Sequence, residues 1–377
     1  MKAAIIGAGF AGDVHATALR ACGVEMGAVV CLVEEEARRF AEKWRIPQYG
    51  TDVAQMLKSE IEVVHICTPP TTHGALIRQC LQAGKHVLCE KPLSTDYAEA
   101  RELAQLEQET DRICAMVLNV RYHMACQRAK EILASGDLGR IYLIHGAYMQ
   151  EFSAFPAPYD WRYREQVAGK MRTVTELGTH WFDVVQHVSG QKVDAVSAQF
   201  GCFNRERILK DGFTYPADSG EDGQKVMVES EDAAVISLRY DNGAIGSLLL
   251  SGVSPGRGNH LNFEIACERG NLWWNEEENN VLHIGKKGEG IRKEVFAFGN
   301  GFSDTFVGLM QAFYDAVEAH GAGADGRSDA DSCQRTGTCE SRYPGFSQGA
   351  EICEICEAVY RSSREDSRWV RIQEVRG

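Results

Sequence analysis

Long apolar runs are absent from this sequence, and their absence argues against a membrane-spanning helix. No apolar stretch approaches the roughly 20 residues that such a helix needs. Residues 1–6 are mostly apolar, but glycines interrupt the run at once and no small-residue cleavage site follows. We therefore do not expect a secretory signal peptide.

Positive charge is scarce relative to negative charge. The chain has 40 Lys and Arg against 53 Asp and Glu, a net charge of −13 at pH 7. This balance argues against nucleic acid and anionic membrane surfaces as partners, because both require a basic face. It does not exclude a small anionic substrate, since one basic pocket can lie in an acidic protein. The simplest consequence of the charge is solubility.

The thirteen cysteines lack a regular metal-binding spacing. Cys333, Cys339, Cys353 and Cys356 are irregularly spaced, and the last two lie in a predicted helix among isoleucines, so we predict no metal site. Scattered cysteines in a large chain are typical of a reducing cytosol, and we expect a cytoplasmic protein. The cysteines in apolar runs, read as small buried hydrophobes, are Cys31, Cys67, Cys80, Cys89, Cys114 and Cys267.

A length of 377 residues is typical of two domains. In the first 122 residues, short apolar runs alternate with amphipathic stretches. This pattern predicts a parallel sheet with helices on both faces. The expected strands are residues 2–6, 27–33, 63–68, 86–89 and 113–118, and the expected helices are residues 11–22, 34–44, 51–58, 72–83 and 97–109.

Strands dominate the pattern after residue 122. Asp241-Asn242-Gly243 is a strong hairpin signal between two of them. We therefore predict a second, α+β domain over residues 123–377 with a large, mostly antiparallel sheet. Its expected strands are residues 140–149, 194–203, 232–240, 244–253 and 262–267, its expected helices are residues 124–134, 176–187, 302–319 and 351–361, and residues 321–332 are an expected loop.

A Gly7-x-Gly9-x-x-Gly12 pattern, with Phe10 and Ala11 between its glycines, follows the first expected strand and opens the first expected helix. The glycines allow a tight turn and a close approach of backbone to a pyrophosphate, and the helix N-terminus supplies N–H donors. This context predicts a dinucleotide site; a fold that has lost its ligand is the alternative.

The choice of cofactor depends on the end of the second expected strand. Glu34 lies 22 residues beyond Gly12, close to where a ribose-binding carboxylate is expected. It could equally begin a solvated helix, because Glu35 and Glu36 follow it. No Lys or Arg stands at this turn to accept a 2′-phosphate, which favours NAD over NADP.

Two further segments end strands at the same edge of the expected parallel sheet. Thr68 and Pro69 stand at the end of the third strand and His73 lies at the start of the next helix, which favours packing against a cofactor over an ordinary loop. Glu90-Lys91-Pro92 follows the fourth strand. A Lys beside a cofactor and partly withdrawn from water can hold or move a proton, whereas a lone Lys is usually a solvated surface group.

The second candidate constellation is Glu176-Leu-Gly178-Thr-His180-Trp-Phe-Asp183. Spacings of 4 and 3 place Glu176, His180 and Asp183 on one helical face, with His187 after them. His is the natural proton acceptor near neutral pH. Gly178 in a helix interior indicates a close approach, such as a nicotinamide or substrate ring. The alternative is a satisfied buried His with acids on the helix surface.

Taken together, these motifs resemble the glucose-fructose oxidoreductase / inositol dehydrogenase / rhizopine catabolism (Gfo/Idh/MocA) family. The resemblance covers nearly the whole chain, including residues 136–140 and 358–362. It implies a Rossmann domain, an open-faced C-terminal sheet, and hydride transfer between NAD(P) and a carbon of a sugar or cyclitol. It also implies that Lys91 and His180 are the catalytic pair, with His180 as the base, and that Asp183 binds substrate or orients His180.

The chain departs from the family pattern at two positions. Glu176 stands where the family usually has Asp, and Cys31 stands where its ribose-binding acid is expected. The longer Glu side chain would reach a substrate differently.

Two polar and aromatic stretches give an indication of the substrate. Aromatic faces and Arg side chains suit a polyhydroxylated ring or an aryl glycoside; packing between domains is the alternative. The candidate substrate-binding residues in these stretches are Asn119, Arg121, Tyr122, Trp161 and Arg162.

The leading hypothesis is an NAD-dependent dehydrogenase acting on a secondary hydroxyl of a sugar, cyclitol or glycoside, plausibly at ring C3. A glycoside-cleaving enzyme that works through transient C3 oxidation is the second hypothesis, and a non-catalytic NAD-binding sensor is the third. Because a bare apolar sheet face invites association, we also expect a homodimer or homotetramer.

Overall fold

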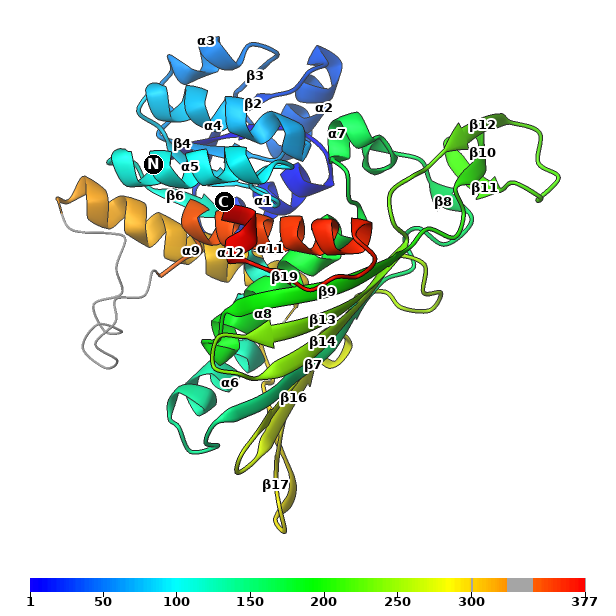
Figure 1. The fold of residues 1–377 in the computed structure, drawn as a ribbon. Helices are drawn as coiled ribbons and strands as arrows, with labels where there is room; N and C mark the ends of the chain where they lie inside the picture. The colour runs from blue at the N-terminus through cyan, green and yellow to red at the C-terminus, as the bar shows by residue number, and fades with distance from the viewer. Residues whose placement is uncertain (300, 324–341, 377) are drawn as a thin grey trace. The chain divides into compact units, whose positions relative to one another are not determined.

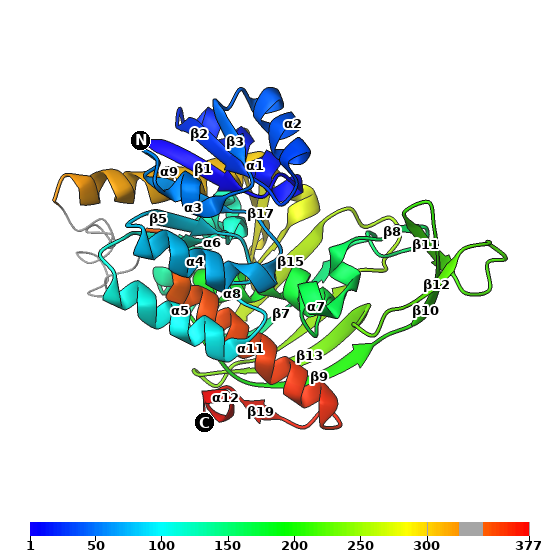
Figure 2. The same ribbon diagram turned by 90° about the horizontal axis from the view of Figure 1, so that it is seen from above.

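The computed structural model describes residues 1–299, 301–323 and 342–376 of the chain (Figures 1 and 2). By its internal contacts the chain divides into two compact units, Met1–Tyr122 with Gly301–Glu351 and His123–Asn300 with Ile352–Gly377. Most of the expected loop at residues 321–332, together with Cys333 and Cys339, lies outside the described residues.

The first unit is built on a six-stranded sheet in the order β3-β2-β1-β4-β5-β6. All its neighbouring strands run parallel, as predicted. Such strands are mostly apolar because helices cover both faces, and all four residues of β4, including His65, are buried. The strands are β1 (Lys2–Ile6), β2 (Glu25–Val30), β3 (Gln48–Gly50), β4 (Val63–Ile66), β5 (His86–Cys89) and β6 (Cys114–Met116).

Helices follow these strands in the order expected of repeated strand–helix–strand units. Sequence analysis missed β3 in this sheet, because its residues Gln48, Tyr49 and Gly50 do not form an apolar run. The helices of the N-terminal segment are α1 (Phe10–Ala21), α2 (Glu34–Trp44), α3 (Val53–Leu57), α4 (His73–Gln82) and α5 (Tyr97–Glu109), with 3-10 turns η1 (Pro70–Thr72) and η2 (Asn119–Tyr122).

A helix from far along the chain, α9 (Phe302–Gly321), completes the core of the first unit. Phe306, Leu309 and Phe313 of α9 lie in the same buried cluster as Ile5 and Leu19. The prediction assigned all of residues 123–377 to the second domain, whereas the contacts group the described residues 301–323 and 342–351 with the first unit. Periodicity identified the helix, but it does not specify which core receives the helix's apolar face.

The second unit is built on a nine-stranded sheet in the order β18-β17-β16-β15-β7-β14-β13-β9-β19. β7 and β14 are parallel, and every other described pair in this sheet is antiparallel, as predicted in the main. The strands are β7 (Ile141–Met149), β9 (Val193–Gly201), β13 (Ala233–Tyr240), β14 (Ile245–Ser251), β15 (His260–Cys267), β16 (Asn271–Asn275), β17 (Val281–Lys286), β18 (Gly290–Val295) and β19 (Val370–Arg371).

One face of this sheet is buried and the other is exposed. From Ala234 to Tyr240 the residues of β13 alternate strictly between buried and exposed, and α8 (Thr179–Ser189) packs against the sheet on its covered side. The alternation is the pattern of an antiparallel sheet with one open face. The remaining helices of this unit are α6 (Met124–Ala134), α7 (Glu165–Ala168) and α12 (Gln373–Arg376), and α11 (Phe346–Arg364) begins in the first unit and continues into the second.

A second, four-stranded sheet in the order β12-β10-β11-β8 extends the second unit. Sequence analysis did not predict it, because its strands are only two to five residues long and show no continuous apolar run. They are β8 (Ala157–Pro158), β10 (Glu206–Lys210), β11 (Phe213–Pro216) and β12 (Gln224–Met227). None of the described helices is both long and apolar enough to span a bilayer.

Candidate functional site

The glycine turn between β1 and α1 has the geometry that its motif requires. Gly7 has a φ of +102°, and a Cβ there would lie 2.7 Å from the carbonyl oxygen of Cys67. A Cβ on Gly12 would lie 2.4 Å from the carbonyl oxygen of Gly7. Both positions therefore exclude any side chain on steric grounds.

Gly9 differs, since a Cβ there would meet no atom within 4 Å. Gly9 is also the N-cap of α1, and no side chain hydrogen-bonds to the helix start there. The backbone N–H groups of the first turn, around Phe10 and Ala11, thus face a space that a pyrophosphate would fit. Because the space beside Gly9 is open and the start of α1 has no side-chain cap, the residues of this turn fit a bound dinucleotide.

The end of β2 differs from the prediction. β2 ends at Val30 rather than at residue 33, and Glu34 is the first, exposed residue of α2. Cys31 is buried, and burial raises the pKa of its thiol to about 11, so it is a neutral thiol at the position where a carboxylate is expected. Leu32, 98% exposed, follows it. A ribose contact by Glu34 stays a prediction.

The segments after β4 and β5 are tied together at the carboxyl edge of the parallel sheet. The ring of buried His73 has Nδ1 2.9 Å from the carbonyl oxygen of Pro92 and Nε2 2.9 Å from that of Thr68. Burial lowers the pKa of His73, and a neutral ring donates at only one of these nitrogens. His73 thus joins the loop that holds Pro69 to the turn that holds Lys91.

The turn with Lys91 is held to the neighbouring strand. The Glu90 N–H donates to the carbonyl oxygen of Ile66 at the end of β4 over 2.9 Å. The Lys91 N–H donates to Glu90 Oε2 over 3.1 Å, and the Lys91–Pro92 peptide bond is cis. Lys91 itself is half-buried. The half-buried Lys91 therefore lies on a constrained backbone at the edge of the sheet where parallel folds place ligands.

Two of the predicted substrate residues in η2 take part in packing inside the first unit. Asn119 Nδ2 donates to Thr305 Oγ1 of α9 over 2.7 Å, and the Tyr122 hydroxyl donates to the carbonyl oxygen of Arg342 over 3.1 Å. Arg121 between them is buried. These contacts give Asn119 and Tyr122 a structural role, and a substrate contact by the three residues stays a prediction.

The second constellation does not form one regular α-helix. Residues Val174–Gly178 form a π-helix, and α8 begins at Thr179. The wider π-turn changes the angular position of Glu176 relative to His180 and Asp183, so the predicted single α-helical face is wrong at this point. Single π-turns inside helices are frequent at functional sites.

The close approach predicted at Gly178 comes from the protein itself. A Cβ there would lie 3.1 Å from Leu250 Cδ1 of β14 and 3.4 Å from the ring of Phe182. The absence of a side chain at Gly178 therefore allows β14 to pack closely against this helical segment. The interpretation that its small size admits a ligand ring is not what the geometry shows.

A hydrogen-bonded group of predicted substrate residues surrounds Glu176. Arg162 Nε donates to Glu176 Oε2 over 3.1 Å, and Arg162 Nη1 donates to Asp160 Oδ2 over 2.7 Å. The Arg162 guanidinium also lies over the Trp161 ring, 4.6 Å from its centroid. The four side chains present carboxylate oxygens, guanidinium N–H groups and an aromatic face together, which suits a polyhydroxylated ring.

The start of the π-helix is anchored by charged residues that sequence analysis missed. Buried Glu231 accepts hydrogen bonds from the N–H groups of Arg172 and Val174. The Arg172 guanidinium pairs with buried Asp232, which also pairs with Arg207 over 2.9 Å. These four charges come from three separate segments, so no local spacing signals them. They hold the backbone that carries Glu176.

His180 lies beside a polar group on the sheet. Its ring meets the Tyr148 ring edge-on, with centroids 6.2 Å apart. The Tyr148 hydroxyl donates to Asn259 Oδ1 over 2.7 Å, and Gln150 Nε2 donates to the same oxygen over 2.8 Å. Asp183, on the same helix, is buried. Tyr148 and Gln150 stand two apart in and just beyond β7, on one face, which is a signal the sequence carried.

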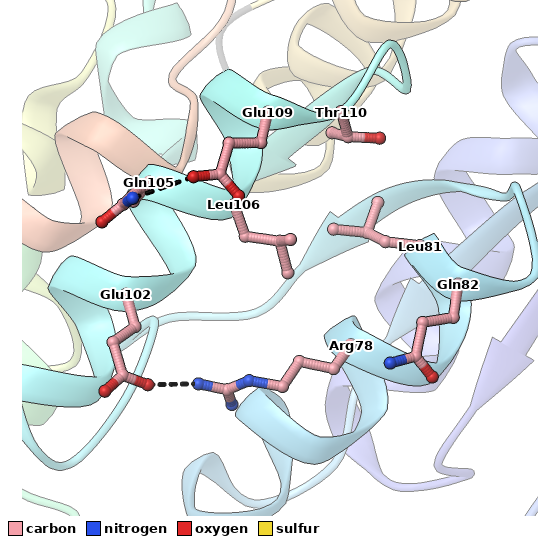
Figure 3. Close-up of a pocket in the computed structure, with 8 residues that line it drawn as sticks. All are labelled: Arg78, Leu81, Gln82, Glu102, Gln105, Leu106, Glu109 and Thr110. Carbon is pink, nitrogen blue, oxygen red and sulfur yellow. Dashed lines mark hydrogen bonds and ion pairs between the residues drawn. The ribbon is translucent and has the colours of Figure 1, made fainter.

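A surface hollow between α4 and α5 contains none of the predicted site residues (Figure 3). Figure 3 shows Arg78 of α4 directed across it toward Glu102 of α5, and Gln105 paired with Glu109 on α5. We assign it no function. Within residues 1–299, 301–323 and 342–376, no three potential ligand side chains are grouped to hold a metal ion.

Two family models match this chain. Residues 1–118 match the model of the oxidoreductase family with an NAD-binding Rossmann fold, and residues 126–273 match the GFO/IDH/MocA C-terminal domain. The chain belongs to the GFO/IDH/MocA oxidoreductase family. The predicted family, the predicted fold class and the predicted NAD cofactor are thereby confirmed.

Named GFO/IDH/MocA relatives match most or all of the chain. Levoglucosan dehydrogenase of Pseudarthrobacter phenanthrenivorans is 25% identical, covering 100% of this chain and 99% of the relative. Myo-inositol 2-dehydrogenase of Thermotoga maritima is 24% identical, covering 85% of this chain and 89% of the relative.

Solved structures of the family share the fold. Levoglucosan dehydrogenase in complex with NADH and L-sorbose has a TM-score of 0.87 at 24% identity, with 100% of both chains covered. An inositol dehydrogenase homolog complexed with NAD+ from Azotobacter vinelandii has a TM-score of 0.82 at 21% identity, covering 98% of this chain and 97% of its own.

Proposed function

We propose that this oxidoreductase is an NAD-dependent dehydrogenase that oxidises a secondary hydroxyl of a sugar, cyclitol or glycoside, with ring C3 as the proposed position. The main support is the end-to-end similarity to levoglucosan dehydrogenase, joined to the presence in this chain of both Lys91 and His180. The polar and aromatic group around Glu176 suits a ring with several hydroxyls.

The cofactor would be held by the first unit. Gly7 and Gly12 allow the tight turn, Gly9 leaves room for the pyrophosphate, and the first turn of α1 offers its N–H groups. When bound, NAD supplies the hydride acceptor for the carbon being oxidised. The other residues proposed to contact it are Phe10, Ala11, Glu34, Thr68, Pro69, His73, Glu90 and Lys91.

Proton handling is assigned to Lys91 and His180. His180 accepts the proton of the reacting hydroxyl while the hydride leaves the same carbon, so the alcohol becomes a ketone and two electrons leave with the hydride. The Lys91 ammonium donates a hydrogen bond to the reacting oxygen and orients it. Half-burial of Lys91 strengthens this bond relative to one made in bulk water.

The remaining hydroxyls of the ring would be bound by side chains of the second unit. Arg162 donates from its guanidinium, Glu176 accepts, and Asp183 accepts or orients His180, while Trp161 offers an aromatic face. Asn119, Arg121 and Tyr122 are proposed as further contacts. Arg121 is buried, and Asn119 and Tyr122 already hydrogen-bond inside the first unit.

A substrate panel tests this proposal. Purified enzyme is given NAD+ or NADP+ with levoglucosan, myo-inositol, glucose and an aryl glucoside, and both NADH formation and aglycone release are measured. Accumulating NADH supports the dehydrogenase. Released aglycone without net NADH identifies a glycoside-cleaving enzyme instead, and tight NADH binding without turnover identifies a sensor.

Assembly and location are part of the same proposal. We expect a homodimer or homotetramer formed through the open face of the large sheet, where Val235 of β13 and Leu249 of β14 stand opposite each other, 52% and 42% exposed. A cytoplasmic location is supported by free thiols such as Cys80 and Cys89 in the described part of the chain.

A further inference from the structure

Four polar side chains form a continuous hydrogen-bonded chain through the core of the first unit. His15 of α1 has Nε2 3.3 Å from Glu90 Oε1 and Nδ1 2.9 Å from His65 Nδ1. His65 of β4 has Nε2 2.8 Å from the Tyr314 hydroxyl of α9. Both histidines are 0% exposed and Tyr314 is 3% exposed. Of the four, sequence analysis singled out Glu90 alone.

Hydrogen-bond chemistry gives this chain a direction. If Glu90 is a carboxylate it only accepts, so His15 must carry its proton on Nε2. The Nδ1 of a neutral His15 then accepts, and His65 must donate from its own Nδ1. His65 Nε2 is left as an acceptor for the Tyr314 hydroxyl. Each neighbour thus fixes the tautomer of the next, and all three bonds are satisfied at once.

The burial of the group supports this arrangement of protons. Burial, and then the nearby His15, lower the pKa of His65 well below its usual value, so His65 is neutral. Burial raises the pKa of Glu90, but the hydrogen bond from His15, together with the charge and the backbone N–H of Lys91, leaves that pKa lowered. Glu90 is therefore a carboxylate at neutral pH.

The chain ends beside the proposed catalytic Lys. Glu90 Oε1 faces His15, while Glu90 Oε2 accepts the Lys91 N–H over 3.1 Å. Two partners, one on each oxygen, fix the plane of this carboxylate. Two histidines in an otherwise apolar core are costly unless paired, and packing alone would be served by apolar residues of similar size.

We propose that His15 is a positioning residue, and that the chain Tyr314–His65–His15 holds Glu90 as an oriented carboxylate beside Lys91 so that Lys91 can orient the reacting hydroxyl. This inference rests on the proposed function, in which Lys91 acts on the substrate oxygen. Loss of the His15 donor leaves one oxygen of a buried carboxylate without a hydrogen bond, which raises the pKa of that carboxyl and favours its protonation.

The titratable groups around Glu90 determine what a pH experiment reports. The groups that face Glu90 are His15 on α1, Cys67 after β4, His73 at the start of α4, Cys89 in β5, and Lys91.

The test compares kcat of wild type and His15→Phe over a range of pH, with each enzyme saturated in NAD+ and substrate. We expect kcat of the variant to fall at least about tenfold at the acid end of the range. A rise of one unit in the pKa of Glu90 produces a change of this size. The ratio of wild-type to variant kcat should fall as pH rises, because raising the pH returns Glu90 to its carboxylate. The affinity for NADH should stay within about twofold.

Three companion variants separate positioning from stability. His15→Gln keeps an N–H donor close to the position of Nε2 and should restore most of kcat. Tyr314→Phe removes only the last hydroxyl and should shift the kcat ratio in the same direction by a smaller factor, which keeps the test available if His15→Phe fails to fold. His86→Phe removes another buried histidine of the same unit, bonded to the Ile113 N–H, and should leave the ratio unchanged.

The tautomers give a readout that needs no substrate. In ¹⁵N-histidine spectra of the protein at neutral pH, His15 should carry its proton on Nε2 and His65 on Nδ1. The opposite tautomers, or a pH-independent kcat ratio in both His15→Phe and Tyr314→Phe, would overturn the positioning role. A wild type without turnover on the whole substrate panel would instead overturn the proposed function, and the positioning role with it.

Discussion

Arg162 donates a hydrogen bond from Nε to Glu176 Oε2 over 3.1 Å, across 14 positions of sequence. Both residues are predicted substrate contacts, and the structure joins them into one group. Burial lowers the pKa of the Arg162 guanidinium, but the carboxylates of Glu176 and Asp160 raise it more, so the net pKa is raised. The Glu that replaces the family's usual Asp is long enough to make this contact from a π-turn.

Shortening Glu176 tests this relationship. In Glu176→Asp the carboxylate should no longer reach Arg162, and the pair is partly exposed, so we expect a loss of about 0.5–1 kcal/mol, or roughly a two- to fivefold rise in KM. The NADH affinity should not change. Steady-state kinetics on the best substrate of the panel measures this, with Glu165→Asp, an exposed residue of α7, as the control. An unchanged KM would remove Glu176 from substrate binding.

The proposed catalytic pair makes the sharpest kinetic prediction. Lys91→Ala and His180→Ala should each lower kcat by roughly 10²–10⁴, the usual contribution of a positioned acid–base group. NADH titration by fluorescence should show binding retained in both. Lys225→Ala, which removes an exposed Lys of β12, serves as the control. Near-wild-type rates in both active-site variants would rule out the assignment.

The glycine turn predicts a separation between binding and stability. Gly9→Ala adds a Cβ where the protein has no atom within 4 Å, so the melting temperature should stay the same while NADH affinity falls about tenfold or more. Gly12→Ala places a Cβ against the Gly7 carbonyl and should lower the melting temperature. Thermal melts without cofactor, beside NADH titrations, measure both. If Gly9→Ala binds NADH as wild type does, the pyrophosphate lies elsewhere.

His86 predicts a pH dependence of stability. Burial, and then the charges of Arg112 and His320, lower its pKa from 6.5 to about 4. Because the folded-state pKa is depressed, the unfolded chain takes up the proton first, and stability is lost as pH falls from 6.5 to about 4, by at most about 3 kcal/mol.

The matched variant is His86→Asn, whose side-chain oxygen can still accept the Ile113 N–H but cannot titrate. Urea unfolding at several pH values should show a steeper loss for wild type than for His86→Asn over this window. Parallel curves would mean that His86 is protonated in the folded protein.

The open sheet face predicts the assembly. Charging the opposed pair, as Val235→Lys with Leu249→Lys, should convert the oligomer to a monomer, because two buried charges would repel across the interface. Sedimentation velocity at micromolar concentration reads the outcome. Gln166→Lys, on the exposed surface of α7, controls for added charge. A wild-type protein that sediments as a monomer would contradict the prediction.

Several parts of the fold were predictable because their signals are local. The strands β1, β4 and β5 are mostly apolar, and the turn after β1 needs glycine at Gly7 and Gly12 for steric reasons. The placement of Lys91 at a strand end follows from the same alternation of strands and helices. Each of these depends on neighbours within a few residues.

Other parts could not be predicted because their signals are spread over the chain. The regular i, i+4 spacing from Glu176 to His180 favoured an α-helix, but the Glu231 carboxylate binds the backbone N–H groups of Arg172 and Val174, where the π-turn begins. The sequence analysis placed the end of β2 three residues late. Cys31 and Leu32 continue the apolar pattern of the strand, although the strand itself ends at Val30.

The sequence by itself determined the parallel sheet, the glycine turn, the family and the chemical character of Lys91 and His180, because strand period and turn sterics act locally. The tertiary structure alone decided that α9 completes the first unit, that Arg162 meets Glu176, and that Tyr314 lies 249 positions from its partner His65 in one hydrogen-bonded chain. Contacts of that range depend on how whole elements pack, and a polar residue in a helix or strand carries no mark of the distant partner that satisfies it.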